Sequence, residues 1–332
     1  MDEIKVSICV AYYNRSEYVK ECIQSLLDQD YDSFEIIVVN DGSKDPLTGQ
    51  YLDELDDSRL KIIHQENKGF VDAIRAAIEA SSGKYIAIQG AGDISLPSRI
   101  RRQASVLDEN PQVGIVSCLF ENVVFGGEND GLRKKRGYNN GRISSSDFLN
   151  GSNPLGHGEV MFRRNIYNKV GGYRPYFKFS QDLDLWLLMI DHCEVEIIQE
   201  ILYERRMFMK DGVSTDASKQ FLQKYLAEFA RQCYLDRQKY GKDLIQQYGI
   251  HGGLFRLRST ALSNFIATKI INALLVDDFK KLEMNLRFAK NEPITLKLLI
   301  AFTLVFMFKF KLGRNLGTHF INKYKSKWLC SD

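Results

Sequence analysis

Short, almost wholly apolar runs alternate with helical patterns over the first half of the chain, and this alternation constrains the fold more than any other feature. The segments between the runs carry apolar residues at helical spacing, as in 19–27 and 71–80. Apolar strands that alternate with helices are typical of a largely parallel sheet covered on both faces. The sequence therefore predicts an α/β domain whose strands lie at 6–11, 34–39, 60–63, 85–88 and 113–120.

The second half has a different pattern. Helical spacing dominates from Ser218 onward, where one apolar stripe consists of Phe221, Leu222, Tyr225, Leu226 and Phe229. A chain of 332 residues is long enough for one large domain and an appendage. We therefore predict an α/β domain over 1–215 and an α-helical region over 216–332, without internal repeats.

Composition excludes some classes of function. The net charge of +3 is too small to indicate nucleic acid as a partner. The six cysteines form no Cys-x-x-Cys pair, and Cys9 and Cys22 lie within apolar patterns, so buried free thiols are expected and a zinc site is not. Free thiols indicate a reducing, cytoplasmic compartment. The N-terminus lacks the basic start and long apolar core of a signal peptide, so none is expected.

Polar clusters follow three of the predicted strands. They are Tyr13-Asn14, Asp41-Gly42-Ser43 and the run from Gly90 to Asp93. Ligands of parallel sheets bind beyond the carboxyl ends of the strands, where such loops converge. Each cluster alone is equally typical of a turn, since Asn, Asp, Gly and Ser are turn formers. Their joint placement favours one composite site.

Two further local expectations concern Ser16 and the region 126–152. Ser16 is expected to cap the helix over 19–27. The region 126–152 is rich in Gly, Asn, Ser and charge and contains Arg133-Lys134-Lys135-Arg136. It is interpreted as a solvated surface loop, with a mobile loop near a ligand site as the alternative.

Several short motifs follow one another over about the first two-thirds of the chain. They are Val6-Ser7-Ile8 with Tyr13-Asn14-Arg15, Val38-Val39-Asn40-Asp41-Gly42-Ser43, Asn67-Lys68-Gly69, Asn153-Pro154 with His157, Val160 to Arg164, Gly171-Gly172-Tyr173 and Gln181-Asp182-Leu183-Asp184-Leu185-Trp186. In this order, the motifs resemble family two of the nucleotide-sugar glycosyltransferases, of the bacterial polysaccharide type. The resemblance implies the GT-A fold, a Rossmann-like and mainly parallel sheet with helices on both faces, followed here by the C-terminal helical appendage.

The resemblance also implies an activity. An inverting transferase of this family moves a sugar from a nucleoside-diphosphate sugar, here favoured as the UDP or dTDP type, to a hydroxyl of a saccharide or lipid-linked saccharide. Asp182 matches the general base that takes the acceptor proton. Its alternative is a carboxylate that only stabilises a helix N-terminus. Asp184 and Trp186 are expected to support the structure.

The resemblance assigns further residues to the donor and the acceptor. Tyr13 is expected to stack on the nucleobase, Asp41 to accept its ring N–H, and Lys68 to meet the diphosphate. Of the neighbouring Arg205 and Arg206, Arg206 is preferred as a second residue that meets the diphosphate. His157 and Gln181 are expected on the acceptor side. The alternatives are a packed histidine for His157, a solvated side chain for Lys68 and a surface salt bridge for Arg206. The full expected donor set is Ala11, Tyr13, Asn14, Asp41, Lys68, Gly90, Ala91 and Arg206.

The family's metal motif is altered in this chain. Both aspartates of the usual D-x-D are glycine in Gly90-Ala91-Gly92-Asp93, and only the neighbouring Asp93 remains. Mg²⁺ accepts few protein ligands, so the sequence predicts a weakly held Mn²⁺ or Mg²⁺ centred on Asp93 and completed by substrate. Two milder departures are Ala11, where proline is usual, and Gln181, where glutamate is usual. Gln181 is expected to lower the pKa of Asp182 relative to the usual pair.

The segment Leu298 to Phe308 is the most apolar of the chain, and Lys297, Lys309 and Lys311 flank it. It is shorter than the roughly 20 residues that cross a bilayer. One interpretation is a helix in the interface of the anionic inner membrane surface, which would make the protein peripheral at the cytoplasmic face. The other is a buried helix of the appendage.

Three other classes of protein agree less well with the sequence. A nucleotidyltransferase should carry a Gly-rich basic loop after the first strand, where this chain has Tyr-Tyr-Asn-Arg. A dinucleotide-dependent oxidoreductase needs Gly-x-Gly-x-x-Gly there. A non-catalytic nucleotide-sugar binding protein fits the loss of the metal aspartates, and the retained Asp93 and Asp182 weigh against it.

Overall fold

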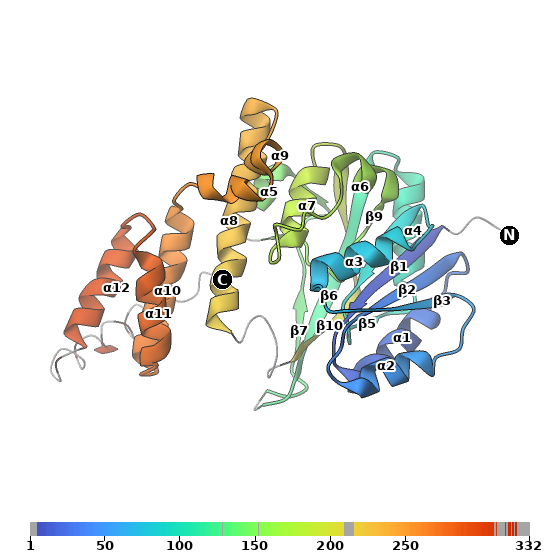
Figure 1. Ribbon diagram of the computed structural model, residues 1–332, viewed down its shortest axis with the longest axis horizontal. Helices are drawn as coiled ribbons and strands as arrows, with labels where there is room; N and C mark the ends of the chain where they lie inside the picture. Colours follow the sequence, from blue (N-terminus) through green and yellow to red (C-terminus); the bar gives the residue numbers. More distant parts are fainter. Residues whose placement is uncertain are drawn as a thin grey trace. The chain divides into compact units, whose positions relative to one another are not determined.

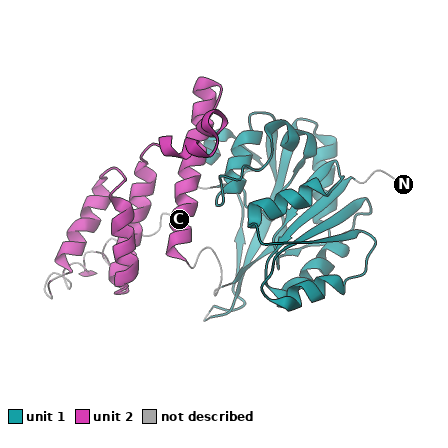
Figure 2. Ribbon diagram, viewed as in Figure 1, with its two compact units in different colours: residues 1–215 teal, residues 216–332 magenta. Residues whose placement is uncertain are grey.

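The computed structural model describes residues 5–127, 129–151, 153–208 and 216–308, together with residues 310, 316, 318, 319, 321 and 323. The chain forms two compact units, 1–215 and 216–332 (Figure 2).

The first unit is built on one sheet, which has ten strands in the described residues (Figure 1). The strand order is β3-β2-β1-β4-β9-β6-β10-β5, while β7 pairs with β6 and β8 with β10. The strands are β1 (Val6–Tyr12), β2 (Phe34–Asp41), β3 (Leu60–Gln65), β4 (Tyr85–Gln89), β5 (Ile94–Ser95), β6 (Val113–Phe125), β7 (Arg133–Arg136), β8 (Arg142–Ile143), β9 (Met161–Arg163) and β10 (Glu194–Phe208). All five strands predicted from apolar runs are present.

The sheet is mainly parallel, as predicted. Strands β3, β2, β1 and β4 pair in parallel, and so do β6 and β10. The short strand β9 lies antiparallel between β4 and β6 and joins these two parallel blocks. The carboxyl ends of β1, β2 and β4 therefore meet at one edge of the sheet.

Helices cover both faces of the sheet because its central strands are apolar on both sides. Val6, Ile8 and Val10 of β1 pack in a core with residues of α1 and α4. On the other face α3 contacts β1 and β2 (Figure 1). The helices of this unit are η1 (Ser16–Tyr18), α1 (Val19–Leu27), α2 (Pro46–Asp53), α3 (Phe70–Glu79), α4 (Arg99–Glu109), α5 (Ser145–Leu149), α6 (Arg164–Val170) and α7 (Gln181–Met189).

Two local expectations are wrong. Residues Arg133–Arg136, expected in a loop, form strand β7 beside β6, with all four side chains exposed. A fully charged edge strand is soluble and resists pairing with a further strand, which explains why its composition resembles a loop. Ser16 does not cap α1, because its hydroxyl donates to Asp45 and a 3₁₀ turn precedes the helix.

The second unit is helical, as predicted. Its helices are α8 (Ala217–Tyr240), α9 (Leu244–Tyr248), η3 (Gly249–Phe255), α10 (Thr260–Leu275), α11 (Phe279–Ala289) and α12 (Leu296–Met307). Of the predicted stripe on α8, Phe229 is buried while Leu222 is exposed. Capping side chains mark helix starts, as where Thr295 accepts from Leu298 N–H.

Helix α12 holds the apolar segment singled out in the sequence. Leu298, Ala301 and Leu304 are buried in the core with α10, as a core helix requires. Its opposite face exposes Leu296, Leu299 and Phe306. Among the residues that the structure describes, every helix is too short or too polar to cross a bilayer. Lys309 and Lys311 lie outside the described residues.

The cysteines behave as expected from their apolar surroundings. Cys9, Cys22, Cys118, Cys193 and Cys233 are all free, and all but Cys193 are buried. Cys330 lies outside the described residues.

Candidate active site

The three polar clusters that follow β1, β2 and β4 are tied to one another. Asn14 donates its N–H to Ser43 Oγ across 2.8 Å, and its Oδ1 accepts the N–H of Lys44 across 2.9 Å. Arg15 donates to the carbonyl of Ala91 across 2.9 Å. Asn14 and Arg15 both have positive φ, which turns the chain sharply at the end of β1. The structure thus brings these clusters into one place.

Asp41 ends β2 and organises the loop that follows β3. Its Oδ1 accepts from Gln65 and from the N–H of Lys68, and its Oδ2 accepts from the N–H of Gly69. The side chain is buried, and the hydrogen bonds from these three donors stabilise its carboxylate there. A carboxylate offers about four acceptor positions, so Oδ2 can still accept one further N–H.

Asp93 ends the loop after β4 and is also buried. Its Oδ2 accepts from the Tyr203 hydroxyl across 2.6 Å, and its Oδ1 accepts from the N–H of Arg206 across 2.7 Å. Burial raises the pKa of Asp93, against these two hydrogen bonds, which favour the charged form. Asp93 therefore joins the β4 loop to β10.

The contacts of Asp93 do not fit a divalent cation held by protein ligands. A cation of this kind binds carboxylates that it can reach and that can turn toward it, whereas Asp93 is 8% exposed and its two oxygens are oriented toward donors of β10. Within the described part of the chain, no group of three or more His, Cys, Asp or Glu side chains is arranged to hold a metal ion. A cation at the predicted site would therefore have fewer than three such protein ligands among the described residues.

Asp182 lies in the first turn of α7, directly after Gln181. Its Oδ2 accepts from the side-chain amide of Asn153 across 2.9 Å. Burial raises the pKa of Asp182 to about 6, although backbone N–H groups of α7 and the charge of Arg205 lower it. Ser180, with φ of 53°, turns the chain into the helix. A half-buried carboxylate with this pKa can be ionised at neutral pH and can still take a proton.

His157 lies between the loop after β3 and the segment that precedes α7. Its ring meets the ring of Phe70 edge-on at 5.1 Å, and its Nε2 shares a 2.6 Å hydrogen bond with the Tyr173 hydroxyl. Burial and the positive charge of Arg205 lower the pKa of His157 to about 3. His157 is therefore neutral, and it joins the Asp41 loop to the surroundings of Asp182.

Arg205 and Glu159 form an ion pair whose two charges act on Asp182. Arg205 Nη2 lies 3.0 Å from Glu159 Oε2, and Glu159 is 1% exposed. The charge of Arg205 lowers the pKa of Asp182 and the charge of Glu159 raises it. Sequence reasoning named Arg205 but preferred Arg206, and it overlooked Glu159, whose only signal was its place two residues after His157.

Arg206, the next residue of β10, does not share the neighbours of Arg205. Its guanidinium pairs with Glu21 of α1 and packs on the rings of Tyr18 and Phe125. Its backbone N–H holds Asp93, so the residue lies beside the β4 loop.

The remaining predicted residues differ in exposure. Tyr13 is 39% exposed, and Lys68 is exposed on the loop held by Asp41. Ala11 is buried in β1. Asp184 pairs with Arg174, and Trp186 is fully buried, which agrees with the structural roles expected of Asp184 and Trp186.

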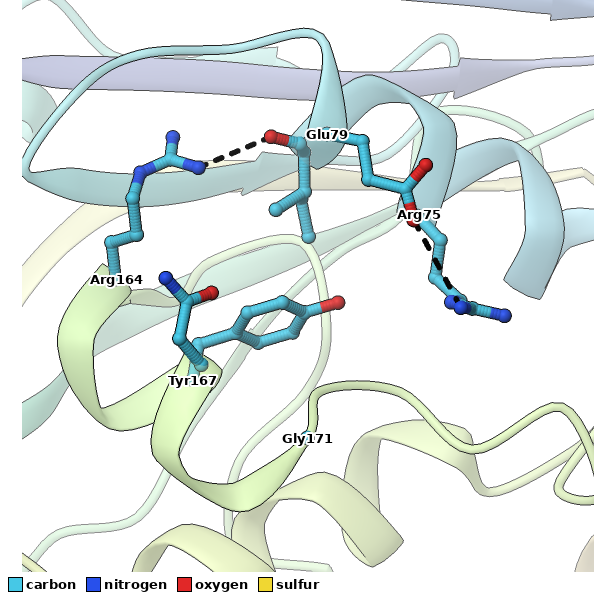
Figure 3. Close-up of a pocket in the computed structure, with 7 residues that line it drawn as sticks. Arg75, Glu79, Arg164, Tyr167 and Gly171 are labelled. Carbon is cyan, nitrogen blue, oxygen red and sulfur yellow. Dashed lines mark hydrogen bonds and ion pairs between the residues drawn. The ribbon is translucent and has the colours of Figure 1, made fainter.

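A separate hollow of about 280 Å³ lies at the far end of α3 from Phe70 (Figure 3). Arg164 lines the hollow and donates to the carbonyl of Ile78 across 3.1 Å, while Arg75 faces Glu79. Arg164 also donates to the carbonyl of Gly83 and to the hydroxyl of Ser81, so it connects α6 to the loop before β4. None of the predicted site residues lines this hollow.

Comparisons with known proteins identify the family. The model described as Glycosyl transferase family 2 matches residues 7–171. The uncharacterized glycosyltransferase MJ1057 of Methanocaldococcus jannaschii is 30% identical over 233 residues, which cover 68% of this chain and 78% of that protein. This chain belongs to glycosyl transferase family 2. A second relative, an uncharacterized glycosyltransferase of Haemophilus influenzae, is 33% identical over 168 residues; the match covers 50% of this chain and 49% of that protein.

Solved structures agree with the fold expected of family 2. TarS 1-349 of S. aureus in complex with UDP-GlcNAc has a TM-score of 0.53 at 17% identity, over 86% of this chain and 90% of that one. The mannosyltransferase PcManGT of Pyrobaculum calidifontis, in complex with GDP-Man and Mn²⁺, has a TM-score of 0.53 at 16% identity, over 95% of this chain and 83% of that one. The predicted GT-A fold is confirmed.

Proposed function

We propose that this chain is an inverting glycosyltransferase, which moves a sugar from a nucleoside-diphosphate sugar to a hydroxyl of a saccharide or lipid-linked saccharide. Membership of family 2 supports the class of reaction. The observation that carries the proposal is Asp182, a carboxylate in the first turn of α7, held by Asn153 and bordered by the Arg205–Glu159 pair.

The proposed chemical step begins with ionised Asp182. The carboxylate takes the proton of the acceptor hydroxyl as its oxygen attacks the anomeric carbon. The new C–O bond forms on the face opposite the bond to the diphosphate, which leaves, so the anomeric configuration inverts. A pKa of about 6 places the base near the pH at which a cytoplasmic enzyme works. Asn153 orients the carboxylate through the hydrogen bond to Oδ2.

The proposed donor site lies at the edge where β1, β2 and β4 end. The exposed ring of Tyr13 is available to stack on a nucleobase. Oδ2 of Asp41 has one protein donor and can accept the ring N–H of a uracil or thymine. Lys68 follows on the same loop, where its charge suits the diphosphate. The two fold relatives were solved with different nucleotide sugars, TarS with UDP-GlcNAc and PcManGT with GDP-Man, so the preference for a uracil or thymine base rests on Asp41.

The proposed acceptor side consists of His157 and Gln181. Burial keeps His157 neutral, so it can exchange hydrogen bonds with sugar hydroxyls without competing with Asp182 for the proton. Gln181 is adjacent to Asp182 and is likewise neutral.

We also propose that the second unit attaches to an anionic membrane surface through α12. Leu296, Leu299 and Phe306 are 74%, 52% and 62% exposed on this helix. An exposed apolar stripe beside a basic tail is typical of interfacial helices. Such attachment would bring a lipid-linked acceptor to the enzyme.

The glycines at 90 and 92 favour one alternative, a protein that binds nucleotide sugars without transferring them. Turnover separates the two functions. Incubation of the full chain with UDP-, dTDP- and GDP-sugars and a lipid-linked or free saccharide should release the nucleoside diphosphate from one donor, and Asp182→Asn should not. Binding of a donor with equal, background release by both proteins would establish the alternative.

A further inference from the structure

The turn Gly90–Asp93 is held by hydrogen bonds with β10 and with Gln89 at the end of β4. The Tyr203 hydroxyl accepts from the N–H of Gly90 across 3.0 Å and donates to Asp93 Oδ2 across 2.6 Å. The N–H of Arg206 donates to Asp93 Oδ1, and the side chain of Gln89 donates to the Asp93 carbonyl across 2.8 Å. Moving the Asp93 carboxylate toward a cation would leave buried donors unsatisfied, which is costly.

Gly90 leaves the space that the Asp93 carboxylate occupies. A β-carbon at position 90 would lie 2.2 Å from Asp93 Oδ2 and 3.0 Å from the Tyr203 hydroxyl oxygen. An aspartate at 90 therefore cannot coexist with Asp93 in this position. Gly92 has φ of +87°, and a β-carbon there would meet Phe208 at 3.2 Å and Tyr18 at 3.3 Å. The glycines are thus required by the closed turn.

A half-paired arginine lies beside this turn. The side chain of Arg206 is 5% exposed, and its Nη2 lies 2.5 Å from Glu21 Oε1, whose side chain is 64% exposed. Within the described residues, Nε and Nη1 of Arg206 have no hydrogen-bond partner. The guanidinium packs on Tyr18, the residue that also borders Gly92. Buried guanidinium N–H groups without acceptors are rare, because they cost free energy unless a ligand supplies the acceptors.

We propose that the Gly90–Asp93 turn holds no divalent cation, and that Arg206, which the family resemblance assigns to the diphosphate, supplies the compensating positive charge in place of the metal. The inference rests on the proposed function, since it names how that site receives its donor. Arginine suits this task because its planar fork offers two parallel N–H groups to phosphate oxygens and its charge is permanent. The exposed Glu21 can move into solvent when the diphosphate arrives.

Calorimetric titration of the full chain with UDP, dTDP and GDP, in EDTA and in Mn²⁺, tests whether the donor nucleotide binds without a divalent cation. We expect one nucleotide to bind with an affinity that changes less than about threefold between the two conditions. Binding that requires Mn²⁺ would overturn this inference and leave the proposed function standing. Failure of all three nucleotides to bind in both conditions would instead count against the proposed function and this inference together.

Arg206→Gln tests whether the guanidinium of Arg206 binds the diphosphate. Arg101→Gln is the matched control, since Arg101 lies on the surface of α4 and pairs with Asp30. We expect Arg206→Gln to weaken binding of the nucleoside diphosphate at least about tenfold, as loss of a charge-assisted pair does. Arg101→Gln should bind as the parent does. Unchanged affinity in folded Arg206→Gln would overturn the assignment.

Glu21→Gln keeps the test decisive if Arg206→Gln does not fold. Because this change removes the carboxylate that competes for the guanidinium, it should tighten nucleotide binding by about two- to fivefold. Weaker binding would contradict the inference.

Gly90→Asp should lower the melting temperature and should not make nucleotide binding depend on Mn²⁺. A gain of Mn²⁺ dependence would contradict the inference, because it would show that the turn can open to hold a cation.

Discussion

The side-chain amide of Asn153 donates to Oδ2 of Asp182 across 2.9 Å, and so joins the segment before β9 to the first turn of α7. A donor aimed at a carboxylate stabilises its ionised form. This single contact orients the proposed base and also helps to set the pH at which it acts.

Asn153→Ala should move the acid limb of kcat/KM to higher pH. Loss of a hydrogen bond to a charged group raises the pKa of Asp182, by about one unit on ordinary energies for such bonds. The pH–rate profile of the purified enzyme measures the shift. Asn150→Ala, at an exposed position of the same segment, serves as the control and should leave the limb in place. An unchanged limb in Asn153→Ala would mean that the contact does not act on the base.

The Arg205–Glu159 pair predicts two opposite shifts. Glu159→Gln removes a negative charge that raises the pKa of Asp182, so the acid limb should move to lower pH. Arg205→Gln removes a positive charge that lowers the pKa of Asp182, so the acid limb should move to higher pH. Arg205→Lys keeps the charge and should leave the limb close to that of the parent. Shifts of the same sign in Glu159→Gln and Arg205→Gln would refute this electrostatic account.

Strand β10 shows why the sequence could not choose between Arg205 and Arg206. Successive side chains of a strand point to opposite faces, so the choice depends on the register. Register shifts interrupt the pairing of β10 with β6 between Ile198 and Tyr203, just before the arginines. These bulges depend on the neighbouring strand and carry no local sequence signal. The apolar runs, in contrast, predicted five strands correctly because burial on both faces requires such runs.

Short elements escaped prediction for a similar reason. Strand β9 has three residues and exists because it fills the gap between β4 and β6. The role of Ser16 was misjudged because Asp45, 29 residues away, accepts its hydroxyl. The polar clusters at the ends of β1, β2 and β4 were predictable because parallel topology brings the ends together.

Asn14 should be needed for its conformation as well as its hydrogen bonds. Asn14→Ala loses the bond to Lys44 and puts at a φ of 56° a residue that lacks the local hydrogen bonding by which asparagine tolerates this conformation. Asn14→Gly loses the same bond but adopts a positive φ without steric cost. The left-handed conformation costs a non-glycine residue about 1–2 kcal/mol, which is several degrees of melting temperature. Thermal unfolding should therefore rank the parent above Asn14→Gly and Asn14→Ala lowest. Equal melting of the two variants would exclude a contribution from the positive φ.

The exposed stripe of α12 should decide binding to lipid. Replacing Leu299 and Phe306 together by Ser should lower sedimentation with anionic vesicles about tenfold or more, since each apolar side chain contributes roughly 1.5–3 kcal/mol when buried. Replacing Ile250 and Leu254 by Ser, two exposed apolar residues of η3 in the same unit, controls for general apolarity. Equal recovery of all three proteins with the vesicles would refute the proposal that α12 binds the membrane surface.

The pH dependence of sugar transfer, measured for the parent and for Asp182→Asn, tests the central claim most directly. Deprotonation of Asp182 switches the base on, so kcat/KM of the parent should rise about tenfold per pH unit below pH 6 and level off above it. Asp182→Asn should lose this limb and should be about 10²–10⁴-fold slower on the plateau. Transfer by Asp182→Asn at the parent's rate, with the same pH profile, would show that another group takes the acceptor's proton.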